Sequence, residues 1–183
     1  MITLIEKARA FATAAHAAVQ QVRKYTGEPY INHPIEVAQI VGSVGGSDEQ
    51  IAAALLHDVV EDTGVTIELI YKEFGQKVGD YVMWLTDVSK PEDGNRKVRK
   101  ALDREHTAAS PPEVKTVKLA DLISNSKSIL EHDRNFARVY LREKQELMAV
   151  LTEGDPTLYA QAQKLLEEGF VSLYQEKSEV ASQ

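Results

Sequence analysis

The sequence predicts an all-α protein that folds as a single compact bundle of about eight to ten helices. Apolar residues recur at helical spacing, and in the first segment Leu4, Ala8, Phe11 and Ala15 share one face. No segment sustains the alternation of apolar and polar residues that is typical of half-buried strands. Glycine, proline and capping residues interrupt the apolar pattern, so we expect helices joined by short connections.

These interruptions delimit the predicted helices in order along the chain. Pro34 at a first helical position indicates one helix start, and Ser47 with Gln50 forms a predicted capping box at the next. Ser110 before Pro111 is interpreted as the cap of a later helix. We therefore expect helices over residues 3–21, 32–45, 47–63, 66–74, 76–88, 95–109, 110–130, 134–152 and 156–176.

Length and composition indicate one globular domain. The chain has 183 residues, of which 43% are hydrophobic and 27% are charged. We expect the domain to span residues 1–176 and a polar tail to span 177–183. The absence of cysteine excludes disulfides and thiolate catalysis, and the net charge of −7 does not indicate a nucleic-acid partner. Without a signal peptide or a run of about 18 apolar residues, no membrane association and a cytoplasmic location are expected.

An acidic cluster ends the third predicted helix. His57, Asp58, Glu61 and Asp62 lie in its last turns, where the helix dipole disfavours negative charge. No lysine or arginine lies within a turn of these acids, so a bound divalent cation would supply the missing positive charge. Glu61 and Asp62 lie one turn beyond the His-Asp pair, where an acid can orient or deprotonate a water. The alternative is a solvated acidic helix end that binds nothing.

Two residues elsewhere in the chain favour the metal site. His33 lies at a helix start after a basic loop. Asp121 follows an apolar run, so we expect it beside the core, where an unpaired carboxylate is costly. Together with His57 and Asp58 these residues form a set of two imidazoles and two carboxylates that suits Mn²⁺, Fe²⁺ or Zn²⁺.

Four segments, in the same order, resemble the HD-domain phosphohydrolases and in particular the hydrolase domain of RelA/SpoT-type alarmone enzymes. Residues 23–34 read RKYTGEPYINHP, which is similar to the family pattern RKxxGxPYxxHP. Residues 57–63 match the HDxxEDT motif, residues 85–89 resemble a TD-containing stretch, and residues 117–121 are similar to VKLAD. The resemblance extends over roughly the first 150 residues, and the short chain is similar to the stand-alone small alarmone hydrolases.

The resemblance implies an HD-domain bundle that binds one divalent ion per chain, usually Mn²⁺. It also implies a small-molecule nucleotide as the partner, and it leaves open whether the protein forms a homo-oligomer. The residues that match the metal ligands of the family are His33, His57, Asp58 and Asp121.

The resemblance also implies roles in catalysis and substrate binding. Glu61 and Asp62 match the acids that position and activate the attacking water. One departure from the family bears on guanine recognition, because Leu122 and Ser124 stand where the bacterial enzymes usually have arginine and histidine. The residues that match substrate contacts are Arg23, Lys24, Asn125, Lys97 and Tyr140, with Arg96 beside Lys97.

The implied activity is hydrolysis of the 3′-pyrophosphate of guanosine tetra- or pentaphosphate (ppGpp or pppGpp) to GDP or GTP and pyrophosphate. Alarmone synthesis in this family uses a separate domain that follows the hydrolase domain, so we expect degradation only. One alternative is a related phosphohydrolase that acts on another nucleotide such as NADPH. Another is a non-catalytic alarmone-binding sensor, although retention of both Glu61 and Asp62 argues against it.

Other conspicuous side chains are expected to have no part in the chemistry. His16 lies on the polar side of the first helix and is expected at the surface. His106 and His132 are also expected to be exposed, and Trp84 is expected in the core or in a cleft wall. The basic run over residues 96–100 is either a phosphate contact or a solvated face.

Overall fold

A computed structural model describes residues 2–180 of the chain, and within them it contains nine α-helices and one short 3-10 helix. No strand occurs in this part of the chain beyond an isolated bridge between Val22 and Pro29, which confirms the predicted all-α class. The helices are α1 (Leu4–Ala18), α2 (Asn32–Ser43), α3 (Asp48–Leu56), α4 (Val59–Asp62), α5 (Ile67–Leu85), η1 (Pro91–Asp93), α6 (Arg96–Ala108), α7 (Pro112–His132), α8 (Arg134–Met148) and α9 (Pro156–Val180).

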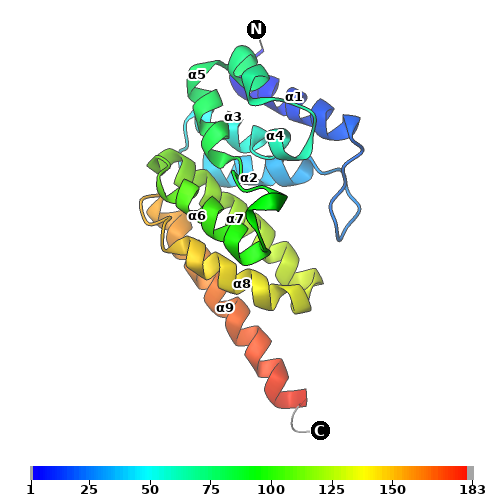
Figure 1. The fold of residues 1–183 in the computed structure, drawn as a ribbon, viewed down its shortest axis with the longest axis vertical. Helices are drawn as coiled ribbons and strands as arrows, with labels where there is room; N and C mark the ends of the chain where they lie inside the picture. Colours follow the sequence, from blue (N-terminus) through cyan, green and yellow to red (C-terminus); the bar gives the residue numbers. More distant parts are fainter. Residues whose placement is uncertain (1, 181–183) are drawn as a thin grey trace.

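Two helices, α3 and α7, form the centre of the bundle. Helices α1 to α5 lie at one end of the molecule, α6 to α8 cross its middle, and α9 extends to the opposite end (Figure 1). Helix α3 packs against α1, α2 and α5, whereas α7 packs against α2, α5, α8 and α9. Residues 52–56 of α3 are all buried, as expected for a helix surrounded on every side. Polar groups carried by these two helices are therefore held in a rigid, close-packed setting.

The third predicted helix, over residues 47–63, is wrong as a single element. Helix α3 ends at Leu56 and α4 begins at Val59, so His57 and Asp58 form a junction. The backbone at Asp58 has φ −96° and ψ −5°, which departs from regular α-helix. This break carries the His-Asp pair toward α2 and α7, so the two side chains do not lie on the faces of one continuous helix.

The expected cap of α7 is also wrong. The hydroxyl of Ser110 donates to the carbonyl oxygen of Thr107 at 2.7 Å, at the end of the preceding helix. Pro111 occupies the N-cap position instead, and α7 begins at Pro112. Proline at this position is compatible with a helix start because the first N–H groups have no partner within the helix.

The break expected between residues 74 and 76 is present as a kink within α5. Gly75 has φ 82°, a conformation that glycine adopts at little cost. The last helix continues past residue 176 to Val180, so the first part of the expected tail is helical, and residues 181–183 lie outside the described residues. The division of the chain at residue 176 stays a prediction. No helix in residues 2–180 is long and apolar enough to cross a membrane.

Candidate metal centre and active site

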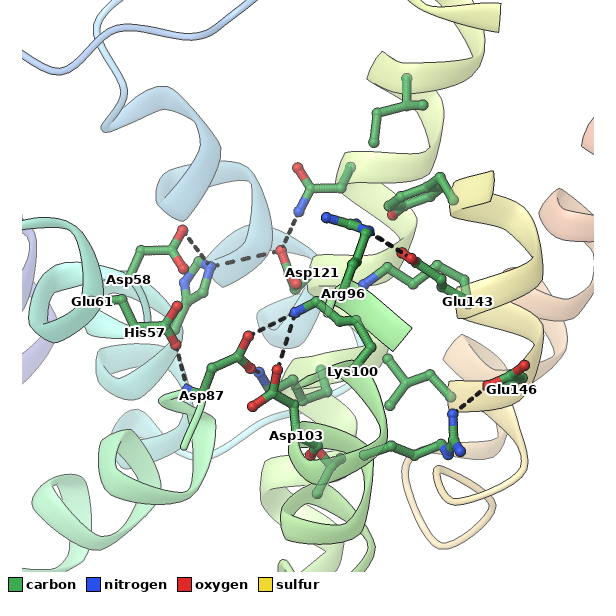
Figure 2. Close-up of a pocket in the computed structure, with 18 of the residues that line it drawn as sticks. His57, Asp58, Glu61, Asp87, Arg96, Lys100, Asp103, Asp121, Glu143 and Glu146 are labelled. Atoms are coloured by element: carbon green, nitrogen blue, oxygen red, sulfur yellow. Dashed lines mark hydrogen bonds and ion pairs between the residues drawn. The ribbon is translucent and has the colours of Figure 1, made fainter. Parts of the chain in front are cut away.

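Four side chains from three parts of the bundle meet at one point. His33 comes from the first turn of α2, His57 and Asp58 from the α3–α4 junction, and Asp121 from α7. Nε2 of His33 lies 3.0 Å from Oδ1 of Asp121, and Nε2 of His57 lies 3.0 Å from Oδ2 of Asp58. The cross distances are 3.8 Å for His33–Asp58 and 3.7 Å for His57–Asp121. The structure thus brings together the four residues expected as metal ligands, three of which are labelled in Figure 2.

The two imidazoles are arranged as metal ligands. Their Nε2 atoms are buried and have no hydrogen-bond partner. Nδ1 of His57 donates to the carbonyl oxygen of Ala54 at 2.7 Å, which leaves the lone pair of the neutral ring on Nε2. Buried polar atoms without a partner are uncommon in folded proteins. Two such nitrogens beside two carboxylates fit a divalent first-row ion, and His33, His57 and Asp58 offer ligand atoms within 4.8 Å of one another.

Electrostatic interactions keep the carboxylates of this cluster ionised. Burial favours the neutral form of Asp58, but the adjacent His57 lowers its pKa to about 2. Burial opposes ionisation of Asp121 as well, and the adjacent imidazoles of His33 and His57 hold its pKa well below the ordinary value. Burial also disfavours the protonated form of His57, whereas Asp58 and Asp121 raise its pKa well above the ordinary value. The two carboxylates therefore favour positive charge at this point, which a divalent cation supplies in place of protons.

Neighbouring side chains hold the two carboxylates in place. The hydroxyl of Tyr30 donates to Oδ2 of Asp58 at 2.5 Å, and burial together with the Asp58 charge raises the pKa of Tyr30. Nδ2 of Asn125 donates to Oδ1 of Asp121 at 2.7 Å. Hydrogen bonds of this kind orient metal-binding side chains and tune their basicity.

Glu61 and Asp62, the expected catalytic acids, lie in different surroundings. Oε1 of Glu61 accepts a hydrogen bond from the backbone N–H of Asp87 at 2.6 Å. Loss of hydration and the charge of Asp87 raise the pKa of Glu61 to about 7, a suitable value for a general base at neutral pH. Oδ2 of Asp62 accepts from Nε2 of Gln21 at 2.8 Å. Glu61 lines the cavity described below, and Asp62 does not.

His16 is buried, so its expected position at the surface is wrong. Only 1% of the residue is exposed, because the loop after α1 folds back over it. The backbone N–H of Gln21 donates to the carbonyl oxygen of His16, and the rings of His16 and Tyr30 lie 4.8 Å apart. Nδ1 of His16 lies 2.7 Å from Oε1 of Gln21, and Nε2 of the same Gln21 amide donates to Oδ2 of Asp62. A residue assigned to the surface thus belongs to the polar network behind the site.

The other histidines outside the cluster differ from each other. His132 is exposed as predicted, although its ring stacks on Tyr25 with a centroid distance of 5.6 Å. His106 is half-buried, so its expected exposure is wrong: its ring lies 4.7 Å from that of Trp84. Trp84 packs against the hydrophobic core, which confirms its expected structural role.

A cavity of about 340 Å³ opens beside the cluster and is lined by residues of the α3–α4 junction, α6, α7 and α8. In Figure 2, His57 and Asp58 lie on one side of this cavity and Glu143 of α8 lies on the other. Arg96 and Lys100, both from α6, project between them. The site therefore combines the anionic His-Asp cluster, which favours a bound cation, with a cavity wall that carries several basic side chains.

Of the expected substrate contacts in residues 96–140, some line the cavity and one does not. Asn125 and Tyr140 both line it. Arg96 lines it as well, whereas Lys97 is exposed and is not among the lining residues. The helical spacing of the lining residues in α6 explains this difference, because Arg96 and Lys100 are four residues apart and share a face.

The basic pair of the first loop lies outside the cavity lining. Arg23 and Lys24 follow α1, and the backbone N–H of Arg23 donates to the carbonyl oxygen of Glu28 at 2.8 Å. Nζ of Lys24 lies 3.3 Å from Oδ2 of Asp133, at the start of α8. This ion pair connects the loop to α8, on the side of the molecule where Tyr25 also contacts Asp133.

Several lining residues were not expected from the sequence. Asp87 follows α5 and pairs with Lys100 at 2.9 Å, within the segment that resembles the family's TD-containing stretch. The helical spacing of the charged residues in α6 could have indicated a cavity-facing stripe. No comparable signal marked those on α7 and α8. The unexpected lining residues with charge are Asp87, Asp103, Arg104, Lys118, Glu143, Lys144 and Glu146, whereas Lys100 belongs to the basic run over residues 96–100 that was weighed as a phosphate contact.

Comparison with known proteins places this geometry in a family. Residues 8–156 match the family model described as HD domain. The protein named guanosine-3′,5′-bis(diphosphate) 3′-pyrophosphohydrolase MESH1 from Xenopus tropicalis is 42% identical over 132 residues, which cover 69% of this chain and 69% of that protein. The guanosine-3′,5′-bis(diphosphate) 3′-pyrophosphohydrolase of Aquifex aeolicus is 35% identical over 147 residues, or 80% of this chain. Those residues are 21% of the Aquifex protein, so the chain spans about a fifth of such bacterial relatives.

A solved structure shows the same arrangement of helices. It is described as a metazoan ortholog of SpoT that hydrolyzes ppGpp and plays a role in starvation responses, and it matches with a TM-score of 0.81 and 28% identity. The match covers 91% of this chain and 95% of that chain. The helical bundle and its His-Asp cluster define an HD domain, and the chain belongs to the HD domain family. Within that family it is related to the SpoT-type hydrolase domains and to the MESH1-type proteins.

Proposed function

We propose that this protein removes the 3′-pyrophosphate from guanosine tetra- or pentaphosphate with the help of Mn²⁺, giving GDP or GTP and pyrophosphate. The observation that carries the proposal is the convergence of two unpartnered imidazole nitrogens and two ionised carboxylates beside a cavity whose far wall bears cations. Relatives that are 42% and 35% identical carry the name of this activity, which supports the choice of substrate.

The metal would be held by the four residues of the cluster, with one ion per chain. When bound, a divalent ion supplies Lewis acidity, which polarises a phosphoryl oxygen and lowers the pKa of a nearby water. Tyr30 and Asn125 orient the two carboxylates through the hydrogen bonds described above. The proposed ligands are His33, His57, Asp58 and Asp121.

Glu61 and Asp62 would act on the attacking water. Glu61 faces the cavity and has a raised pKa, so it accepts the proton of the water as its oxygen attacks the phosphorus next to the ribose. The bond between that phosphorus and the 3′-oxygen breaks, and the proton then neutralises the leaving 3′-oxygen. Asp62, held by Gln21, orients the water.

The nucleotide would extend from the cavity toward the first loop. Asn125 and Tyr140 contact it within the cavity, where the buried Tyr140 hydroxyl keeps its proton because burial raises its pKa. Arg23, Lys24 and Lys97 lie outside the cavity lining, so their proposed contacts are with phosphate or base groups that project from it. Charge-assisted hydrogen bonds of arginine and lysine to phosphate are among the strongest polar contacts in proteins.

Product analysis with purified protein tests the proposed activity. The protein is incubated with ppGpp and with NADPH at equal concentrations of Mn²⁺, and the products are separated by anion-exchange chromatography. We expect GDP and pyrophosphate from ppGpp, at a higher rate than any phosphate from NADPH. Preferred turnover of NADPH would support the alternative phosphohydrolase, and tight binding of ppGpp without turnover would support a sensor.

Conservative variants of the two acids test the assignment of the catalytic roles. Glu61→Gln and Asp62→Asn keep the shape of each side chain and remove its charge. A general base typically contributes about 10²- to 10⁴-fold, so we expect a rate loss on that scale. Metal content, measured by elemental analysis, should stay at one ion per chain in both variants. Loss of the metal would instead make these acids ligands.

A further inference from the structure

Lys144 differs from the other cations that line the cavity. Arg96 donates two hydrogen bonds to Glu143, at 2.6 and 2.8 Å, and Nζ of Lys100 lies 2.9 Å from Oδ2 of Asp87. Within the described chain, Nζ of Lys144 makes no hydrogen bond or ion pair with another residue. The remaining lining cations also have carboxylate partners, which are Asp87 for Lys118 and Glu146 for Arg104.

The surroundings of Lys144 make its charge costly in the absence of a ligand. The side chain comes from α8, and its Nζ lies 5.2 Å from the ring centroid of Tyr140. Burial lowers the pKa of Lys144; the carboxylates of Asp121 and Asp87 act in the opposite direction, and the neighbouring Lys118 and Lys100 lower it further. Lys144 is half-buried, and a partly desolvated cation without a paired anion costs free energy of folding. An anion that enters the cavity would remove this cost and gain a charge-assisted hydrogen bond.

We propose that Lys144 binds a phosphate group of the substrate from the α8 wall of the cavity, and this inference rests on the proposed nucleotide polyphosphate substrate. Lys144 and the His57–Asp58 pair line the same cavity of about 340 Å³. A nucleotide that carries phosphates at two positions can place one at the metal cluster and present another to Lys144. Lys144 therefore favours substrates that carry a phosphate in addition to the one that is hydrolysed.

The test compares two substitutions at Lys144 with a matched control. Lys144→Met keeps much of the side-chain length and removes the charge, whereas Lys144→Arg keeps the charge. Lys127→Met is the control, because it removes a lysine from an exposed position on α7 that does not line the cavity. The Kd for ppGpp is measured by titration calorimetry on Mn²⁺-loaded protein that also carries Glu61→Gln, which slows turnover.

We expect Lys144→Met to weaken ppGpp binding about 10- to 100-fold, the usual scale for losing a hydrogen bond to a charged group. Lys144→Arg should retain most of the affinity, and Lys127→Met should leave it unchanged. The melting temperature of Lys144→Met should equal or exceed that of the parent protein, because no hydrogen bond or ion pair is lost and a partly desolvated charge is removed. An unchanged Kd in Lys144→Met would overturn the proposal, as would an equal loss of affinity in Lys127→Met.

Failure of the proposed function gives a different result. If the parent protein does not bind ppGpp, the same variants are titrated with GDP and with NADPH. A Kd that depends on Lys144 for either nucleotide supports a phosphate contact at Lys144 with another substrate. Binding of both nucleotides without any dependence on Lys144, or no binding of either, overturns the inference.

Discussion

Oγ of Ser124 lies 3.0 Å from Nδ1 of His33, and the same hydroxyl donates to Oε2 of Glu36 at 2.8 Å. Because the hydroxyl hydrogen is directed to Glu36, Ser124 accepts the N–H of His33, which leaves the lone pair of the ring on Nε2. Ser124, which stands where the bacterial enzymes usually have histidine, thus orients His33 of the His-Asp cluster in this chain.

We expect Ser124→Ala to weaken Mn²⁺ binding about 10- to 100-fold, the typical effect of removing a hydrogen-bond partner behind a metal ligand. The variant leaves Nδ1 of His33 and the carboxylate of Glu36 without their shared partner. Affinity is measured by competition with a calibrated chelator. Ser128→Ala, one turn further along α7, serves as the control because the carbonyl oxygen through which Ser128 contacts His132 is retained. Equal Mn²⁺ affinity in the Ser124→Ala and parent proteins would contradict this role.

The bridge from His16 through Gln21 to Asp62 leads to a second prediction. Gln21→Leu removes the donor that holds Asp62 and leaves Nδ1 of His16 without a partner. Misplacement of an orienting group typically costs up to about 10²-fold, so we expect kcat for ppGpp to fall by about 10- to 100-fold. KM and metal content should change little, since neither the cluster nor the cavity lining is altered. Gln161→Leu, at an exposed position on α9, should have normal kinetics; an unchanged kcat in Gln21→Leu would show that Asp62 needs no support.

Glu61 should make the stability of the metal-free protein depend on pH. Its pKa is raised from 4.5 to about 7 in the folded state, so the unfolded chain releases this proton first as the pH rises. The stability associated with protonated Glu61 is fully present below pH 4.5 and is lost as the pH rises through about 7. Glu61→Gln should therefore raise the melting temperature at pH 8.5 and leave it nearly unchanged at pH 4.5.

Thermal melts in the presence of a chelator measure this effect. Glu105→Gln, which removes an exposed carboxylate from α6, controls for the change in net charge. The prediction fails if Glu61→Gln destabilises the protein at pH 8.5, or if Glu105→Gln stabilises it equally.

Local sequence signals predicted most of the helices because those signals act within the helices themselves. The capping box of Ser47 and Gln50 is present, with the backbone N–H of Gln50 3.3 Å from Oγ of Ser47, and Gly75 breaks α5 through its positive φ. The break at His57 and Asp58 was missed because partners distant in sequence help to hold it. Tyr30 and Asp121 contact these residues across the bundle, and helix propensity contains no information about either.

The candidate site was predictable to the extent that motifs marked it. The four cluster residues were assigned together from their resemblance to a family, and the fold brings their side chains within contact of one another. His16 was assigned to the surface and Lys144 was not assigned to the site, because His16 is buried by a loop that folds back and Lys144 faces the cavity only through the packing of α8. Leu122, the other departure from the bacterial motif, is fully buried in the core and does not line the cavity.

Attack of water on the ribose-linked phosphorus of the 3′-pyrophosphate is tested most directly by hydrolysis of ppGpp in ¹⁸O-enriched water. Mn²⁺-loaded protein is allowed to turn over, and the products are analysed by mass spectrometry. We expect one ¹⁸O atom in the released pyrophosphate and none in GDP, because the bond between phosphorus and the 3′-oxygen is broken. Label in orthophosphate would instead show attack at a terminal phosphate, label in GDP would show cleavage of the bond between carbon and oxygen, and absence of turnover would show that the protein is not a ppGpp hydrolase.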